Sequence, residues 1–376
     1  MSKLRLKPLS QQVVVITGAT SGIGLATARL AQERGARTVL VARNEAALRG
    51  IAEELRRRGG QAEYVVADVA DRAALEAAAN RAEEAFGGFD SWVNDAGTSI
   101  YGEIERTPIE DQRRLFETNY WGVVNGSLIA ARALRGRGGA IVNLGSMLSD
   151  RAMILQGTYS ATKHAVKAFT DALRMELARD GVPISVTLIK PSSIETAFQE
   201  HGRNLLDSPG IRVPPPAYDP RLVARAILHA CEHHKREIVV GFGGHAISLF
   251  GNLFPHTTDL LMQGIGYAAQ TTGKAPRPGR ADNLEAPRED GTEHSLTRPV
   301  APLRKTSLFL EAQLHPVATA AALVGLGALA MGAMAARRLG SGRISLPDPR
   351  RTSIHRLGSE VRRLGHTARR RAGGWL

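Results

Sequence analysis

The feature that most constrains the fold is a glycine-rich run near the N-terminus. The run Thr17–Gly24, with the sequence TGATSGIG, follows the apolar residues 13–16 and precedes a helical apolar pattern at 25–31. A buried strand, a tight glycine turn and a helix, in this order, are typical of a dinucleotide-binding βαβ unit. Gly18, Gly22 and Gly24 permit the turn, and the pyrophosphate rests on the N–H groups at the positive end of the helix.

The same alternation of strand and helix patterns continues through the first 245 residues. Such alternation predicts parallel strands joined by helical crossovers, with helices on both faces and a ligand crevice at the carboxyl ends of the strands. The sequence therefore predicts an α/β, doubly wound Rossmann fold with a seven-stranded parallel sheet. The expected strands are 13–17, 37–42, 62–66, 90–94, 139–144, 184–190 and 237–241, and the expected helices are 22–34, 44–58, 72–86, 109–135, 158–180 and 220–234.

Tyr159 and Lys163 form the most informative chemical pattern in the chain. Residues four apart on a helix project from one face, so a cation would lie beside a phenol. A free phenol has a pKa of about 10, and a nearby ammonium lowers it. Alone this spacing is typical of many helix surfaces. Ser146, thirteen residues upstream, and the glycine run together indicate hydride transfer between a nicotinamide and a carbonyl or alcohol.

These motifs, in this order, resemble the short-chain dehydrogenase/reductase family over roughly residues 10–245, followed by a C-terminal extension. The resemblance implies that Asp68 and Val69 hold the adenine. It also carries two departures, because Asp95 replaces an Asn and Ser192 replaces a Gly of the family motifs. The implied cofactor-binding residues are Gly18, Thr20, Ser21, Gly22, Ile23, Gly24, Arg43, Asp68, Val69, Asn94, Ala96, Gly97, Tyr159, Lys163, Pro191, Ile194 and Thr196.

The resemblance also implies a catalytic tetrad of Asn119, Ser146, Tyr159 and Lys163. In it Ser146 binds the carbonyl oxygen, Tyr159 is the general acid or base, and Lys163 lowers the tyrosine pKa and binds the nicotinamide ribose. Asn119 holds a water that links Lys163 to solvent. We expect substrate contacts at Ser146, Gln156, Tyr159 and Phe198. The alternative function is a catalytically silent nucleotide-binding scaffold or redox sensor.

The end of the second expected strand indicates NADP(H) as the cofactor. An acidic side chain at Ala42 would bind the ribose hydroxyls of NAD and repel a 2′-phosphate. That acid is missing, and Arg43 follows with a guanidinium suited to phosphate.

The segments outside the alternation are predicted to have other roles. Residues 195–219 are expected to be a long surface loop or, as the family resemblance implies, a mobile lid over the substrate. We expect a catalytic domain at 1–245, an apolar helical extension at 246–270, a flexible linker at 271–302, a hydrophobic segment at 303–336 and an Arg-rich tail at 337–376. The tail holds eleven Arg and two acidic residues, so it carries nine of the thirteen net positive charges.

The twenty residues 317–336 carry no charge and are long enough, as a helix, to span a bilayer. We expect membrane association, either by a span or by an interfacial helix, against the alternative of a packed or dimerising soluble helix. A catalytic domain in the cytoplasm would place the tail across the membrane in a single span, against the positive-inside tendency. An interfacial helix or a second hydrophobic stretch avoids that conflict.

The sequence also bears on the substrate, on nucleic-acid and metal binding, and on the oligomeric state. The apolar lid and the expected position near a membrane favour a hydrophobic or lipid-like carbonyl or alcohol as the substrate. Nucleic acid is a less favoured partner for the basic tail, which has one aromatic residue and no recognisable nucleic-acid module. No metal site is expected, because Cys231 with His233 and His234 does not make one. The resemblance implies a homodimer or homotetramer that pairs through 109–135 and 158–180.

Overall fold

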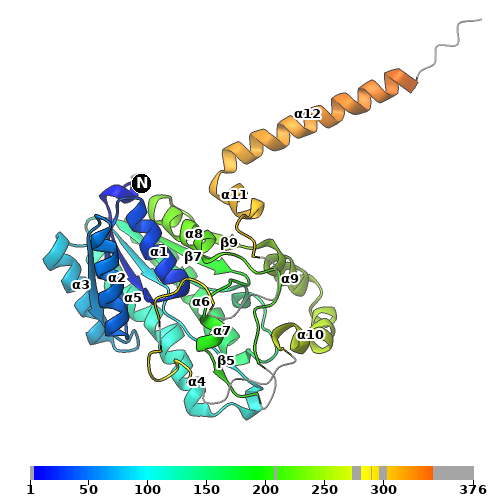
Figure 1. Ribbon diagram of the computed structural model, residues 1–376. Coiled ribbons are helices and arrows are strands. Elements are labelled where there is room, and N and C mark those ends of the chain that lie inside the picture. The colour runs from blue at the N-terminus through cyan, green and yellow to red at the C-terminus, as the bar shows by residue number, and fades with distance from the viewer. Residues whose placement is uncertain (1–3, 207–209, 273–280, 289, 296–302, 342–376) are drawn as a thin grey trace, which may run out of the picture. The chain divides into compact units, whose positions relative to one another are not determined.

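The computed structural model describes residues 4–206, 210–272, 281–288, 290–295 and 303–341. The chain divides into two units, Met1–Pro316 and Val317–Leu376. The first unit contains the sheet and every element that borders the cleft, and the second contains most of one long helix (Figure 1).

The predicted seven-stranded parallel sheet is confirmed. Its strands lie in the order β3-β2-β1-β4-β6-β7-β9, so the chain builds outward from β1 to β3 and then returns to β4. This reversal between β1 and β4 leaves a crevice at the carboxyl ends of the strands. The strands are β1 (Val13–Thr17), β2 (Arg37–Ala42), β3 (Ala62–Val66), β4 (Ser91–Asn94), β6 (Gly139–Leu144), β7 (Ile184–Pro191) and β9 (Glu237–Val240).

Helices cover both faces of the sheet (Figure 1). On one face the buried side chains of α1 (Gly22–Glu33), α2 (Glu45–Arg57) and α8 (Pro220–Glu232) form a core with Val14 and Ile16 of β1. On the other face α3 (Arg72–Phe86), α5 (Gly122–Leu134) and α6 (Gly157–Arg179) pack against Val13 and Val15. Successive β1 residues therefore serve opposite cores, as the two-residue period of a strand requires.

The predicted helix 109–135 is interrupted in its middle. It consists of α4 (Ile109–Phe116), a π-helical turn η3 (Glu117–Trp121) and α5. Such bulges alter the direction in which side chains leave a helix and are frequent at functional sites. Asn119 lies in this turn and is fully buried.

The segment after β7 contains α7 (Phe198–His201) and β8 (Arg203–Asn204). The strand β8 pairs in parallel with β5 (Ile100–Tyr101), which follows β4. This small sheet joins the expected lid region to the loop after β4. Farther along the chain, α9 (Phe242–Leu253) and α10 (Pro255–Gln270) form the expected apolar helical extension.

The structure differs from the expected flexible linker over 271–302. Residues 281–288 and 290–295 make hydrogen bonds and ion pairs with the rest of the first unit, and Leu284 is fully buried. The remainder of that range from 273 onward, residues 273–280, 289 and 296–302, lies outside the described residues. Local composition favoured a linker because its charged and proline residues form no apolar period, whereas their contacts come from distant parts of the chain.

The expected hydrophobic segment 303–336 contains two helices, which belong to different units of the chain. The helix α11 (Leu308–Leu314) belongs to the first unit, where Leu310 and Leu314 join the sheet core. The Gln313 side chain accepts a hydrogen bond from the Val239 N–H and donates one to its carbonyl. This helix therefore covers β9, and the first unit extends to Pro316.

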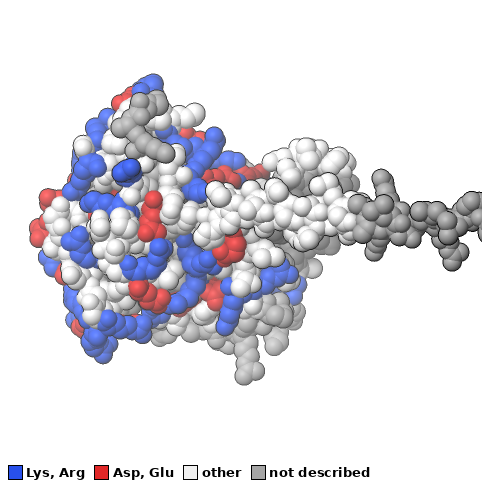
Figure 2. All heavy atoms as spheres, turned by 90° about the horizontal axis from the view of Figure 1, so that it is seen from above, with Lys and Arg blue, Asp and Glu red and all other residues white. Residues whose placement is uncertain are grey.

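The helix α12 (Pro316–Ser341) provides the second unit with its described structure. Its window Pro316–Met334 has a mean hydropathy of 1.9 and none of it is buried, so by length and composition it is able to cross a membrane. On the face of the first unit in Figure 2, Lys and Arg side chains are interspersed with Asp and Glu. The tail beyond Ser341 lies outside the described residues.

Candidate active site

A cavity of about 380 Å³ follows the carboxyl ends of the strands. It runs from the glycine turn, past the ends of β2 and β3, to Ser146 and Tyr159. The sequence-predicted residues that line it are Gly18, Thr20, Ser21, Gly22, Ile23, Arg43, Asp68, Val69, Ala96, Gly97, Ser146, Gln156, Tyr159, Lys163, Pro191, Ile194, Thr196 and Phe198. Three predicted site residues, Gly24, Asn94 and Asn119, lie behind this lining.

The glycine turn has the backbone that the sequence predicts. Gly18 and Gly22 have φ values of +71° and +54°, in the left-handed region that favours glycine. A Cβ at Gly24 would lie 2.2 Å from the Gly18 carbonyl oxygen, so Gly24 permits α1 to begin against the turn. The Thr17 hydroxyl accepts hydrogen bonds of 3.1 Å from the N–H groups of Asp95 and Ala96, which fixes the turn to the loop after β4.

The Asn94 side chain is hydrogen-bonded to three side chains beneath the cavity lining. Its amide donates to Ser127 at 3.0 Å and to Asn143 at 2.8 Å, and its oxygen accepts from the Trp92 indole at 2.8 Å. The side chain is thus held inside the sheet layer by its polar partners, and its contact with a cofactor stays a prediction.

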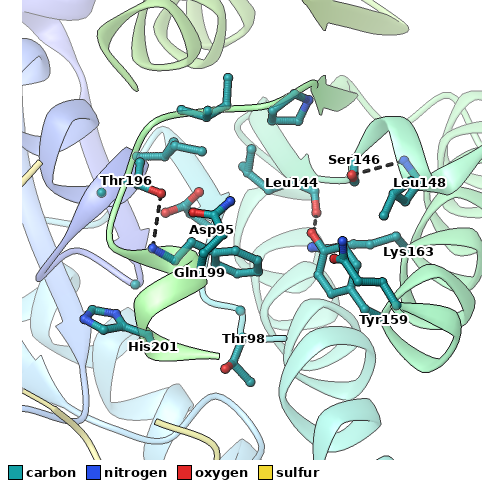
Figure 3. Close-up of a pocket in the computed structure, with 18 of the residues that line it drawn as sticks. Asp95, Thr98, Leu144, Ser146, Leu148, Tyr159, Lys163, Thr196, Gln199 and His201 are labelled. Carbon is teal, nitrogen blue, oxygen red and sulfur yellow. Dashed lines mark hydrogen bonds between the residues drawn. The ribbon is translucent and has the colours of Figure 1, made fainter. Parts of the chain in front are cut away.

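Three of the four predicted tetrad residues meet at the inner end of the cavity (Figure 3). Ser146 follows β6, while Tyr159 and Lys163 lie one turn apart on α6. The Ser146 hydroxyl, which lines the cavity with Tyr159, accepts a hydrogen bond of 3.1 Å from the Leu148 N–H. The Lys163 ammonium donates to the Leu144 carbonyl at 2.8 Å and lies 5.7 Å from the centre of the Tyr159 ring.

Asn119 is placed one layer deeper than these three. Its amide accepts from the Thr98 N–H and donates to the Thr98 carbonyl, both at 2.9 Å, and donates to the Thr162 hydroxyl at 3.2 Å. It therefore joins the loop after β4 to α6. The water that the resemblance implies at Asn119 remains a prediction.

The charge state of the site differs from the one expected from Tyr159 and Lys163 alone. Burial raises the pKa of Tyr159, the Ser146 hydroxyl lowers it in part, and the Asp95 carboxylate raises it further. Burial lowers the pKa of Lys163 to about 8, while Asp95 opposes that change. Here desolvation outweighs the expected lowering of the tyrosine pKa by the lysine.

Asp95 is the departure from the family motif with the clearest electrostatic effect. Burial raises its pKa to about 7, although Lys163 and a hydrogen bond from the Gly24 N–H favour the charged form. The sequence identified this residue, but only the fold shows that its charge acts on both Tyr159 and Lys163.

Asp95→Asn should make the protein more stable at alkaline pH. The pKa of Asp95 rises from 3.8 to about 7 on folding, so its ionisation opposes folding and wild-type stability falls as pH rises through that window. The neutral variant escapes this loss. Its thermal midpoint should exceed that of wild type by several degrees above pH 7, and the two should converge near pH 4. Asp180→Asn, at the exposed end of α6, is the control, and a pH-independent difference would contradict the assignment.

The substrate end of the cavity combines a few polar groups with apolar walls. The Phe198 ring packs edge-on against Tyr159, with centroids 5.7 Å apart. The Gln156 amide donates to Gln270 at 2.6 Å, which ties the start of α6 to the end of α10. Ile247 and Met262 line the cavity from α9 and α10. The apolar extension therefore borders the site, as does the expected lid.

Several lining residues were missed by the sequence analysis. Asn283, Pro287, Arg288 and Asp290 line the cofactor half of the cavity from the stretch expected to be a linker. No local pattern marks them. Among the described residues, no cluster of three or more His, Cys, Asp or Glu side chains is placed to bind a metal. Cys231 is fully buried among the apolar residues of the sheet core.

Comparison with known proteins gives one consistent result. The family described as short chain dehydrogenase matches residues 12–205. An uncharacterised oxidoreductase of Bacillus subtilis, YxnA, is 41% identical over 332 residues, which cover 88% of this chain and 92% of that protein. Dehydrogenase/reductase SDR family member 7B of Bos taurus is 40% identical over 192 residues, covering 49% of this chain and 58% of its own.

The structural comparison agrees with the sequence matches. A short-chain dehydrogenase/reductase from Burkholderia phymatum, solved in complex with NAD, superposes with a TM-score of 0.57 at 25% identity. The superposition covers 72% of this chain and 99% of that one.

Proposed function

The chain belongs to the short-chain dehydrogenase/reductase family of oxidoreductases, and on that premise we propose that it transfers a hydride between NADP(H) and a hydrophobic carbonyl or alcohol. The main observation behind this proposal is that one continuous cavity is lined by the glycine turn and also by Ser146, Tyr159 and Lys163. A dinucleotide extended along it would bring its nicotinamide to the proton donor.

The residues present fit such a cofactor. Gly18 and Gly22 leave the turn without side chains where α1 begins, and a bound anion would take the place of the Thr292 carbonyl that now accepts from the Gly22 N–H at 2.9 Å. When bound, the nicotinamide supplies or accepts the hydride. Asp68 and Val69 line the far end of the cavity, where the resemblance implies adenine.

The side chains of this protein would move and hold the proton. The Ser146 hydroxyl would donate to the substrate oxygen and fix its position beside the Tyr159 phenol, which would then give its proton to that oxygen. In oxidation Tyr159 takes the proton back. Lys163, held by the Leu144 carbonyl, provides a positive charge next to the phenol. The positive charge of an oxidised nicotinamide would favour phenolate further.

The hydrophobic substrate is supported by the walls of the site. The helices α9 and α10 contribute Ile247 and Met262 to the cavity. They also expose a large apolar surface to solvent, formed by Phe242, Leu249, Phe250, Leu253, Phe254, Leu260, Leu261, Ile265 and Tyr267.

A carbonyl panel tests the activity. Purified protein in detergent should oxidise NADPH in the presence of long-chain or bulky ketones and aldehydes, and less with their short polar counterparts. The alternative, a silent scaffold or redox sensor, predicts NADPH binding without turnover of any carbonyl. The exposed Trp121 and Leu128 lie within 109–135, one of the two regions through which the resemblance implies a homodimer or homotetramer. Sedimentation of the same sample tests that assembly.

We expect α12 to hold the full-length protein on membranes, with its catalytic unit in the cytoplasm. The full chain should sediment with membranes and resist a high-salt wash, because salt screens charges but leaves apolar burial intact. A chain ending at Pro316 retains the whole first unit and should stay in the supernatant. A chain lacking only 337–376 should remain bound. Release of the full chain by salt alone would show that the tail holds it by charge.

A further inference from the structure

Two stretches of the C-terminal extension, residues 281–288 and 290–295, lie across the cofactor half of the cavity. We call them together the strap. Asn283, Pro287, Arg288 and Asp290 line the cavity from the strap. The opposite wall is formed by residues of the sheet edge, including Gly18, Asp68 and Val69. The strap is therefore an outer wall of the space that the proposed function assigns to the cofactor.

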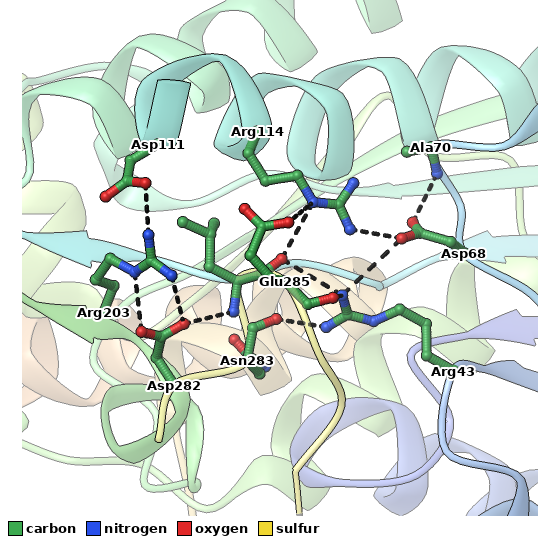
Figure 4. A network of polar contacts seen from close by, with 10 residues as sticks. Arg43, Asp68, Ala70, Asp111, Arg114, Arg203, Asp282, Asn283 and Glu285 are labelled. Atoms are coloured by element: carbon green, nitrogen blue, oxygen red, sulfur yellow. Dashed lines mark hydrogen bonds and ion pairs between the residues drawn. The ribbon is translucent and has the colours of Figure 1, made fainter. Parts of the chain in front are cut away.

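One end of the strap is fixed to the substrate side of the site. Asp282 accepts hydrogen bonds of 2.9 and 3.3 Å from Arg203 on β8 (Figure 4). The Asn283 N–H donates to the His201 carbonyl at 2.9 Å, and the Asn283 side chain accepts from the Thr98 hydroxyl. This end thus joins α7 and β8 to the loop after β4.

The middle of the strap is held over the ends of β2 and β3. The Arg43 guanidinium donates to three successive carbonyls, of Asn283, Leu284 and Glu285, at 2.5, 3.4 and 3.0 Å (Figure 4). The Leu284 carbonyl also accepts from Arg114 at 3.2 Å, and its side chain is fully buried. These contacts bind the strap backbone to the arginine predicted to recognise the 2′-phosphate.

The other end of the strap pairs with the glycine turn. The Gly291 N–H donates to the Thr20 carbonyl at 2.8 Å, and the Gly22 N–H donates to the Thr292 carbonyl at 2.9 Å. The Thr20 hydroxyl donates to Asp290 at 2.8 Å. Glu293 then pairs with Arg29 at 3.0 Å and with Arg221 at 3.3 Å. The strap is anchored on both sides of the cavity.

We propose that this strap encloses the bound cofactor and sets its rate of release. The inference rests on the proposed function, because the cavity must hold a dinucleotide. A cofactor beneath the strap is covered on its outer side, so the strap contacts must separate before the adenosine half can leave. The strap also joins the glycine turn to α7 beside the substrate, so cofactor release and opening of the substrate side share one structural element.

The test loosens both anchors without altering the cavity lining. Asp282→Asn and Glu293→Gln remove the charges that pair with Arg203, Arg29 and Arg221, and neither residue lines the cavity. In stopped-flow fluorescence, the double variant should release NADPH roughly tenfold faster than wild type, with little change in the association rate. Glu311→Gln, which breaks the pair between Arg225 and α11, is the matched control and should match wild type.

Three results would overturn the proposal. An unchanged release rate in a folded double variant would show that the strap does not restrain the cofactor. Tighter binding through faster association would show that the strap excludes the cofactor instead. Failure of the wild type to bind NADPH or NADH would refute the proposed function together with this inference. The two single variants, each keeping one anchor, should show intermediate rates and provide the test if the double variant unfolds.

Discussion

Replacement of Tyr159 by Phe should lower the turnover number by at least about 100-fold, the usual loss when a general acid is removed. The change deletes one hydroxyl, while the ring keeps its packing against Phe198. The glycine turn and Arg43 lie at the other half of the cavity, so the NADPH dissociation constant should change little. Steady-state kinetics and NADPH fluorescence measure the two effects separately.

Tyr64→Phe is the matched control, since Tyr64 lies on β3 and its side chain packs against the sheet core outside the cavity lining. It should leave turnover unchanged. Near-normal turnover of Tyr159→Phe on an authentic substrate would show that another group supplies the proton. A large loss of NADPH affinity would instead mean that the substitution disturbs the cavity and that lost turnover does not report on proton transfer.

The sheet could be predicted from sequence because each strand and its following turn are local patterns. Residues 13–16 are a buried apolar run, and Gly18 and Gly22 have the positive φ values that their turn requires. All seven strands lie within one residue of their predicted bounds. Short-range patterns of this kind also place Ser146, Tyr159 and Lys163 at the carboxyl end of the sheet, because the fold fixes where each strand ends.

The parts that could not be predicted depend on contacts between distant residues. The charged and proline residues of the strap follow no helical or strand period. The ion pairs that anchor it join distant residues: Glu293 of the strap and its partner Arg29 are more than 260 residues apart. The pKa of Tyr159 likewise depends on desolvation and on Asp95, which spacing along a helix does not reveal. The sequence identifies these groups, whereas the free energy of their ionisation follows from burial.

The supporting residues show the same limit at a finer scale. Asn94 and Asn119 occur in family motifs, so sequence reasoning placed one at the cofactor and the other at a water. Asn94 has polar partners within the sheet layer, which its motif alone does not reveal, and its contact with a cofactor stays a prediction. Asn119 lies in a π-helical turn that no residue pattern announces. Each is close to the site and acts through the elements that it joins.

Combining Ala42→Asp with Arg43→Leu should reverse the preference for NADPH over NADH. In the wild type, Arg43 lines the cavity at the end of β2, where no acid precedes it. The variant loses a charge-assisted bond to the 2′-phosphate and gains a carboxylate that repels this phosphate and accepts from the ribose hydroxyls of NAD. Each change is worth about 1.4 kcal/mol or more, so the ratio of kcat/KM values should move by roughly 100-fold.

Arg43 also holds the strap, so a second control is required. The Asp282→Asn/Glu293→Gln variant loosens the strap without changing any group expected near the 2′-phosphate. It should accelerate release of NADPH and NADH alike and leave their kcat/KM ratio near that of wild type. Equal kcat/KM values of the wild type for the two cofactors would contradict the assigned preference. A shifted ratio in the strap variant would mean that discrimination depends on the strap as well as on the Arg43 charge.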